Sequence, residues 1–146
     1  MKSVYWVGAH KVHLFLERFL ETNNALGYSN WDSKAIWVRT TSAKNGKPHK
    51  IESALVVFFH EMFHMLDFMQ GHRLFYDSDN ENMNEQKEDA LDSLCEALVV
   101  FLLRNNLLDK GWLEKFETTL INVAPLTESE LKKEEEKVNE SNGNSE

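Results

Sequence analysis

Residues 51–70 constrain the fold more than any other part of the chain. The segment contains no glycine, proline or asparagine, so nothing in it signals a turn. Its apolar residues include Ala54, Leu55, Val56, Val57, Phe58, Phe59, Met62, Phe63, Leu66 and Phe68. A helix that is apolar nearly all round is a buried helix. The sequence therefore predicts one buried helix over 51–70, against which the rest of the chain packs.

Two imidazoles and a carboxylate lie in the middle of this apolar segment, namely His60, Glu61 and His64. At about 100° per residue, the two histidines lie roughly 40° apart on one helix face, one turn apart, so their ring nitrogens can converge on one ion. Glu61 lies about 100° round from His60, beside such an ion. This His-Glu-x-x-His arrangement is that of two zinc ligands and a general base. Burying these groups without partners would be costly, which favours a metal site over satisfied polar groups of the core.

A third metal ligand is expected on the helix that follows. A catalytic zinc keeps three protein ligands and leaves one position for water, whereas a structural zinc has four. Measured round that helix from Leu91, Glu88 lies about 60° away and Asp92 about 100° away. We therefore expect Glu88 as the ligand and Asp92 as the acceptor of a ligating histidine's free N–H, although both acids could simply favour the helix N-terminus. Asp67 is expected to contact a ligand without binding the metal, and His72 is an alternative ligand.

Together these two patterns are similar to those of small gluzincin-type zinc metallopeptidases, including the SprT-like and ImmA/IrrE-like minimal domains of phages and bacteria. The first pattern is His60-Glu61-Met62-Phe63-His64 on one helix. The second is Glu88-Asp89-Ala90-Leu91-Asp92 on the next, which matches Glu-x-x-x-Asp. The resemblance covers about residues 27–104, and its first motif is the more specific.

The resemblance implies a zincin-like fold and hydrolysis of a peptide bond in a protein or peptide substrate. In such a site His60, His64 and Glu88 bind Zn²⁺, and Asp92 orients a histidine. Glu61 acts as general base on a water that the zinc activates. The rival interpretation is a non-catalytic module that zinc stabilises and that binds a protein partner.

The N-terminal part contributes the strands of an α+β fold. Residues 3–7 are rich in β-branched and aromatic residues and predict a short strand. Residues 10–21 fit both a helical period and a strand alternation, and we favour the helix. His10 and His13 are three residues apart and are interpreted as bystanders rather than as a second metal pair.

The remaining segments complete the predicted domain. Residues 23–31 predict a loop with one tight turn. Residues 34–41 predict a strand, which either is purely structural or has a free edge that could hold an extended peptide. A helix is predicted from about residue 84 to 104, and a shorter one over 109–120. The apolar stripe of the longer helix is Leu91, Leu94, Cys95, Leu98, Phe101 and Leu102. The prediction is a small sheet packed on the buried active-site helix, with a second helix that carries the glutamate.

Charge and length divide the chain into a domain over residues 1–126 and an acidic, disordered tail over residues 127–146. The net charge of −8 argues against nucleic acid or an anionic membrane as the main partner. The single cysteine, Cys95, excludes an internal disulfide and fits a reducing compartment. No apolar run resembles a signal peptide or a membrane span, so a cytoplasmic location is expected.

Overall fold

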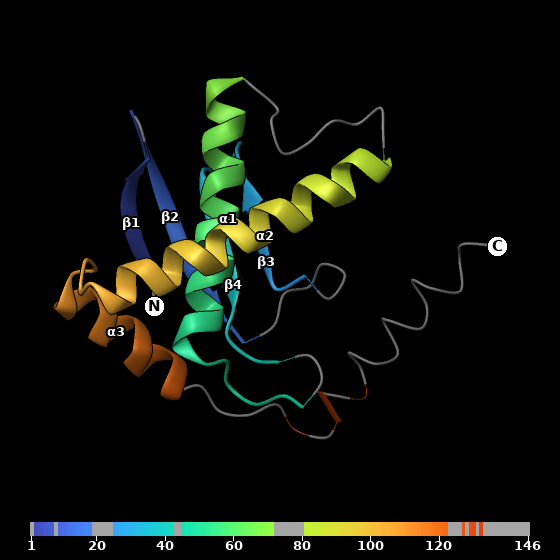
Figure 1. Cartoon of the computed structure of the whole chain (residues 1–146). Helices are drawn as coiled ribbons and strands as arrows, with labels where there is room; N and C mark the ends of the chain where they lie inside the picture. Colours follow the sequence, from blue (N-terminus) through green and yellow to red (C-terminus); the bar gives the residue numbers. More distant parts are fainter. Residues whose placement is uncertain are drawn as a thin grey trace.

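The computed structural model describes residues 2–7, 9–18, 25–42, 45–71 and 81–122, together with residues 127, 129, 130 and 132. Within these residues the fold is α+β, with a four-stranded mixed sheet in the order β1-β2-β4-β3 and three helices (Figure 1). The elements are β1 (Lys2–Val7), β2 (His10–Glu17), β3 (Gly27–Asn30), β4 (Ala35–Arg39), α1 (Ile51–Gln70), α2 (Glu81–Arg104) and α3 (Lys110–Ile121).

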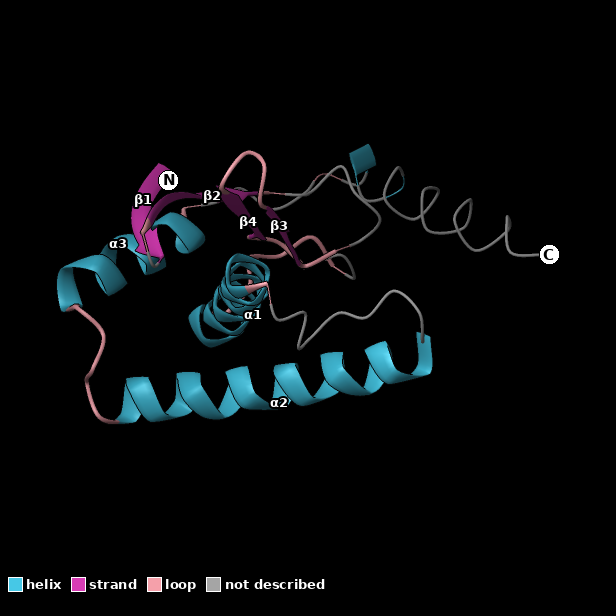
Figure 2. Cartoon of the chain, turned by 90° about the horizontal axis from the view of Figure 1, so that it is seen from above, coloured by secondary structure: helices cyan, strands magenta, loops and turns pink. Residues whose placement is uncertain are grey.

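Helix α1 forms the middle layer of the molecule. Seen along its axis, it lies between the sheet on one side and α2 on the other (Figure 2). Its predicted bounds are confirmed. The helix ends where Gly71 adopts the left-handed conformation, with φ of 66°, and donates its backbone N–H to the carbonyls of Asp67 and Phe68. The side chains of Ala54 and Leu55 are fully buried, as expected for a helix covered on two sides.

The helix predicted for residues 10–21 is wrong over residues 10–17, because these form strand β2. Its alternating residues Val12, Leu14 and Leu16 are buried, with exposed fractions of 1%, 0% and 9%. β2 pairs antiparallel with β1 and parallel with β4. The two ladders satisfy its backbone groups on both sides, and this long-range pairing outweighs a local helical period.

The loop predicted for residues 23–31 is also corrected, because Gly27–Asn30 forms strand β3. β3 pairs antiparallel with β4 and ends the sheet on that side. The predicted strand over 34–41 is confirmed as β4, but the alternative that gave this strand a free edge is wrong. β4 is bonded to β2 on one side and to β3 on the other, so the outer edge of the sheet belongs to β3.

Helix α2 is confirmed, and its buried face is rotated from the predicted one. Leu91, Cys95 and Val99 are buried, with exposed fractions of 1% or less, whereas Leu94 and Phe101 of the predicted stripe are largely exposed. At about 100° per residue, the buried three lie between 0° and roughly 80° from Leu91. The centre of the face therefore moves toward the helix edge that carries the two acids.

The other predicted elements are recovered where they are described. The strand over 3–7 is part of β1, and the short helix predicted over 109–120 is α3. Asp109 caps α3 by accepting the backbone N–H of Trp112 at 2.7 Å, and Phe116 and Leu120 are buried.

The predicted tail lies outside the described residues, apart from residues 127, 129, 130 and 132. Among these, Glu130 forms an ion pair with Arg18 at 3.1 Å. None of the described helices is long and apolar enough to cross a membrane.

The rotation of α2 can be tested with two adjacent valines. Val99 is 1% exposed and Val100 is 46% exposed. Because a buried carboxylate has no partner in an apolar contact, we expect Val99→Asp to lower the free energy of unfolding by about 3 kcal/mol or more. Val100→Asp carries the same loss of helix propensity and should cost about 1 kcal/mol or less. Urea unfolding followed by tryptophan fluorescence measures both, and equal losses would contradict this register.

Candidate metal centre

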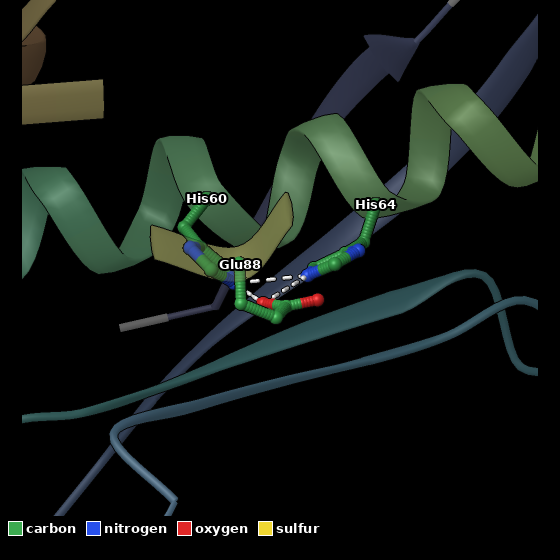
Figure 3. Close-up of side chains that lie close together, drawn as sticks. All are labelled: His60, His64 and Glu88. Carbon is green, nitrogen blue, oxygen red and sulfur yellow. Dashed lines mark hydrogen bonds and ion pairs between the residues drawn. The ribbon is translucent and has the colours of Figure 1, made fainter. Parts of the chain in front are cut away.

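His60 and His64 project from the face of α1 that is turned toward α2. Figure 3 shows their rings and the carboxylate of Glu88, from α2, pointing at one another. The Nε2 atoms of the two histidines are 2.9 Å apart. One carboxylate oxygen of Glu88 lies 3.1 Å from Nε2 of His60 and 3.3 Å from Nε2 of His64. Three potential ligand atoms thus converge from two helices.

The spacing of these three atoms fits a tetrahedral metal. Bonds of about 2.0 to 2.1 Å to zinc place neighbouring ligand atoms roughly 3.3 Å apart. The observed separations of 2.9 to 3.3 Å are close to that value. His60, His64 and Glu88 could therefore hold a metal ion without large movements of either helix.

Asp92 determines which nitrogen of His60 is available to an ion. The Nδ1 atom of His60 lies 2.7 Å from a carboxylate oxygen of Asp92, which can only accept a hydrogen bond when it is ionised. Nδ1 therefore donates its N–H to Asp92, and Nε2 is the nitrogen that is directed into the cluster. A metal ion can accept a lone pair from all three converging atoms at once, whereas a proton is bonded to one of them.

Glu61 is the neighbour of His60 on α1 but faces the sheet. Its side chain is buried, with an exposed fraction of 9%, and it forms a hydrogen bond with Ser29 of β3. Burial raises the pKa of Glu61 above its ordinary value, and the negative charges of Glu88 and Asp92 act in the same direction. The hydrogen bond from Ser29 and the proximity of His60 oppose that shift.

A groove of about 640 Å³ opens beside these groups. It lies between the N-terminal half of α1, the middle of α2 and the start of β3, and both His60 and Glu61 line it. Its apolar part is formed by Leu26, Val56, Val57, Val99 and Val100. Its acidic lining groups are Glu52, Glu61, Asp92 and Glu96, and no lysine or arginine is among the described lining residues. The groove has room for a ligand and is acidic.

The structure brings together most of the predicted site. His60, His64 and Glu88 form one group, and Asp92 contacts His60 in the expected way. Asp67 is buried further along α1 and does not belong to the group formed by His60, His64 and Glu88. Its predicted contact with one of these metal-ligating side chains stays a prediction. His72 lies outside the described residues.

His10 and His13 contribute no ligand to this group. They are three positions apart on strand β2, so their side chains leave opposite faces of the sheet. The His10 ring packs against Trp31 at a centroid distance of 5.1 Å. This placement agrees with their interpretation as bystanders.

Sequence reasoning missed the contribution of β3 to the site. Gly27 lines the groove and Ser29 bonds to Glu61, but both fell in a segment predicted to be a loop. The available signal was a serine two residues after a glycine, which places both on one face if the segment is a strand.

Comparisons of the chain with protein-family models, with curated proteins and with solved structures found no match. The interpretation of this site therefore depends on its geometry and on its sequence motif.

The free thiol of Cys95 lies on the buried face of α2 and should be unreactive. Burial, aided by the nearby charge of Asp92, raises the pKa of the Cys95 thiol to about 11. Because the thiolate is the reactive form, a pKa raised from 9.0 to about 11 lowers its concentration roughly a hundredfold at pH 8. We expect the native protein to react with dithiobis(nitrobenzoate) at least about a hundred times more slowly than the urea-unfolded protein. Comparable rates would show that the thiol is accessible.

Proposed function

We propose that this protein is a zinc-dependent metallopeptidase with a zincin-like fold, in which His60, His64 and Glu88 bind the metal and Glu61 is the general base. The observation that carries the proposal is the convergence of three ligand atoms within 3.3 Å of one another, beside a buried glutamate and a groove. Two imidazoles and one carboxylate are a ligand set that catalytic zinc uses in peptidases.

The donor atoms favour zinc over the commoner hard cations. Magnesium and calcium prefer oxygen ligands, whereas two imidazole nitrogens suit a transition metal such as zinc. When bound, zinc would polarise a water molecule and the carbonyl group of the substrate.

The residues of the chain supply the remaining functions. Glu61 accepts a proton from water at its carboxylate and passes it to the departing amine. Asp92 holds the His60 ring through Nδ1, so that Nε2 keeps its direction. The groove receives the polypeptide next to Glu61, and its acidic lining predicts a preference for segments that carry lysine or arginine.

A second candidate function is that of a non-catalytic module that zinc stabilises and that binds a protein partner. It is favoured by Leu94 and Phe101, which lie about 20° apart round α2 and are each about half exposed. In that case metal binding would be retained and no hydrolysis would be observed. The same metal site would then only join α1 to α2.

Zinc binding can be measured by competition with a chromophoric chelator. We expect His64→Ala and Glu88→Gln each to weaken zinc affinity at least about a hundredfold, because each removes a ligand. Asp92→Asn should weaken it roughly 10- to 100-fold through the lost support of His60. The matched control is Asp89→Asn on the exposed face of α2, which should bind zinc as the wild type does. Zinc affinity unchanged by His64→Ala and Glu88→Gln would contradict the site.

Hydrolysis is tested with the zinc-loaded protein and unstructured polypeptides rich in lysine and arginine. Glu61→Gln should retain zinc and lose roughly 10²- to 10⁴-fold in kcat, because it removes the general base. Glu52→Gln, at the exposed end of the groove, should leave kcat within about threefold, since it carries no proton in the reaction. Cleavage unaffected by Glu61→Gln would exclude Glu61 from the mechanism. Zinc-loaded wild type that cleaves none of these substrates would support the binding module instead.

A further inference from the structure

Strand β3 lies directly against Glu61. Successive side chains of a strand leave opposite faces, so Gly27 and Ser29 share one face and Tyr28 takes the other. The Tyr28 ring packs against Trp37, with 5.6 Å between the ring centroids. Gly27 and Ser29 are therefore the β3 positions on the face that meets Glu61 of α1.

Gly27 leaves no space for a side chain. A Cβ atom at this position would lie 2.7 Å from Cγ of Glu61, 2.8 Å from its Oε1 and 2.6 Å from Cγ1 of Val57. All three distances are shorter than real Cβ contacts allow. Gly27 does not have a positive φ angle, so its backbone conformation does not require a glycine. The close approach of Glu61 and Val57 does. The backbone of β3 thus packs against the stem of the Glu61 side chain.

Ser29 contacts the other end of the same side chain. Its hydroxyl donates a hydrogen bond to the Glu61 carboxylate. Because Glu61 is only 9% exposed, little water is available to take over this contact. The pairing of Ser29 with Ile36 in the neighbouring strand holds its backbone in place.

We propose that Gly27 and Ser29 are positioning residues for Glu61, with the glycine backbone fixing the path of its methylene groups and the serine hydroxyl fixing the direction of its carboxylate. The edge strand of the sheet then determines where the proton acceptor stands in the groove. The consequence for catalysis rests on the proposed function. The packing of β3 against Glu61 does not rest on the proposed function, so it can be tested without any substrate.

The first experiment measures packing through the urea midpoint of unfolding. Gly27→Ala should lower the midpoint, because its methyl group collides with Glu61 and Val57. In the Glu61→Ala background the same substitution should cost less than half as much, and less again when Val57→Ala is added. Glu52→Ala, an exposed position on the same helix, should give no such relief. An equal loss from Gly27→Ala in all backgrounds would overturn the proposal, whether or not the protein is an enzyme.

The second experiment uses the zinc-loaded protein and the polypeptides that the wild type cleaves. Ser29→Ala should lower kcat about tenfold with KM and zinc content unchanged, and Ser29→Thr, which keeps a hydroxyl, should restore kcat to within about threefold. Tyr28→Phe removes a hydroxyl from the opposite face of the same strand and should leave kcat, KM and zinc content unchanged. In the Glu61→Gln background Ser29→Ala should have no further effect, because the serine acts through Glu61.

The two experiments separate the possible failures. An active enzyme whose kcat is unchanged by Ser29→Ala, or whose loss is not restored by Ser29→Thr, overturns the role of the serine. A zinc-loaded wild type without activity overturns the proposed function, and the urea cycles then decide on their own whether β3 packs Glu61 as inferred.

Discussion

The contact between α1 and α2 is made by two kinds of interaction that depend on each other. The buried face of α2, formed by Leu91, Cys95 and Val99, packs in the core. Glu88 and Asp92 lie on the adjoining edge, where they meet the histidines of α1. The apolar packing fixes the rotation of α2, and the rotation determines how close the carboxylates come. Rotating α2 about its axis by a few tens of degrees would separate Asp92 from Nδ1 of His60, because the Asp92 carboxylate lies several ångström from the helix axis.

Helix α1 distributes its functional side chains between two neighbours. The two histidines face α2, and Glu61, about 100° round the helix, faces the sheet. Each group is therefore held by a different element, the histidines by the carboxylates of α2 and the glutamate by β3. This division explains why a helix in the middle layer carries the site. A surface helix could be contacted by only one of the two.

The same arrangement buries ionisable groups, which costs free energy, and provides each of them with polar partners. Glu61 is buried, yet Ser29 bonds to its carboxylate and the groove connects it to solvent. At the histidines, two imidazole nitrogens and a carboxylate oxygen lie within 3.3 Å of one another, an arrangement that a bound cation would stabilise. The acidic side chains that line the groove also favour a positively charged ligand beside the histidines. The proposed metal binding and the proposed preference for a basic substrate thus both rest on this one distribution of charge.

Sequence alone determined the features that are local to one helix. The bounds of α1, the spacing of His60 and His64 and the offset of Glu61 all follow from 3.6 residues per turn and from an apolar segment without turn residues. The choice of Glu88 as the nearest acid on the next helix also follows from that periodicity. These predictions needed no information about neighbours.

Only the tertiary structure decided what depends on pairing between distant segments. Residues 10–17 fit two periods, and the ladders with β1 and β4 selected the strand. Gly27–Asn30 is a strand because β4 offers it an edge, and this alone brought Gly27 and Ser29 to Glu61. The rotation of α2 was likewise set by which apolar residues found the core. The physical reason is that backbone hydrogen bonds in a sheet and close packing between elements are satisfied by partners far away in the chain, which a local pattern does not contain.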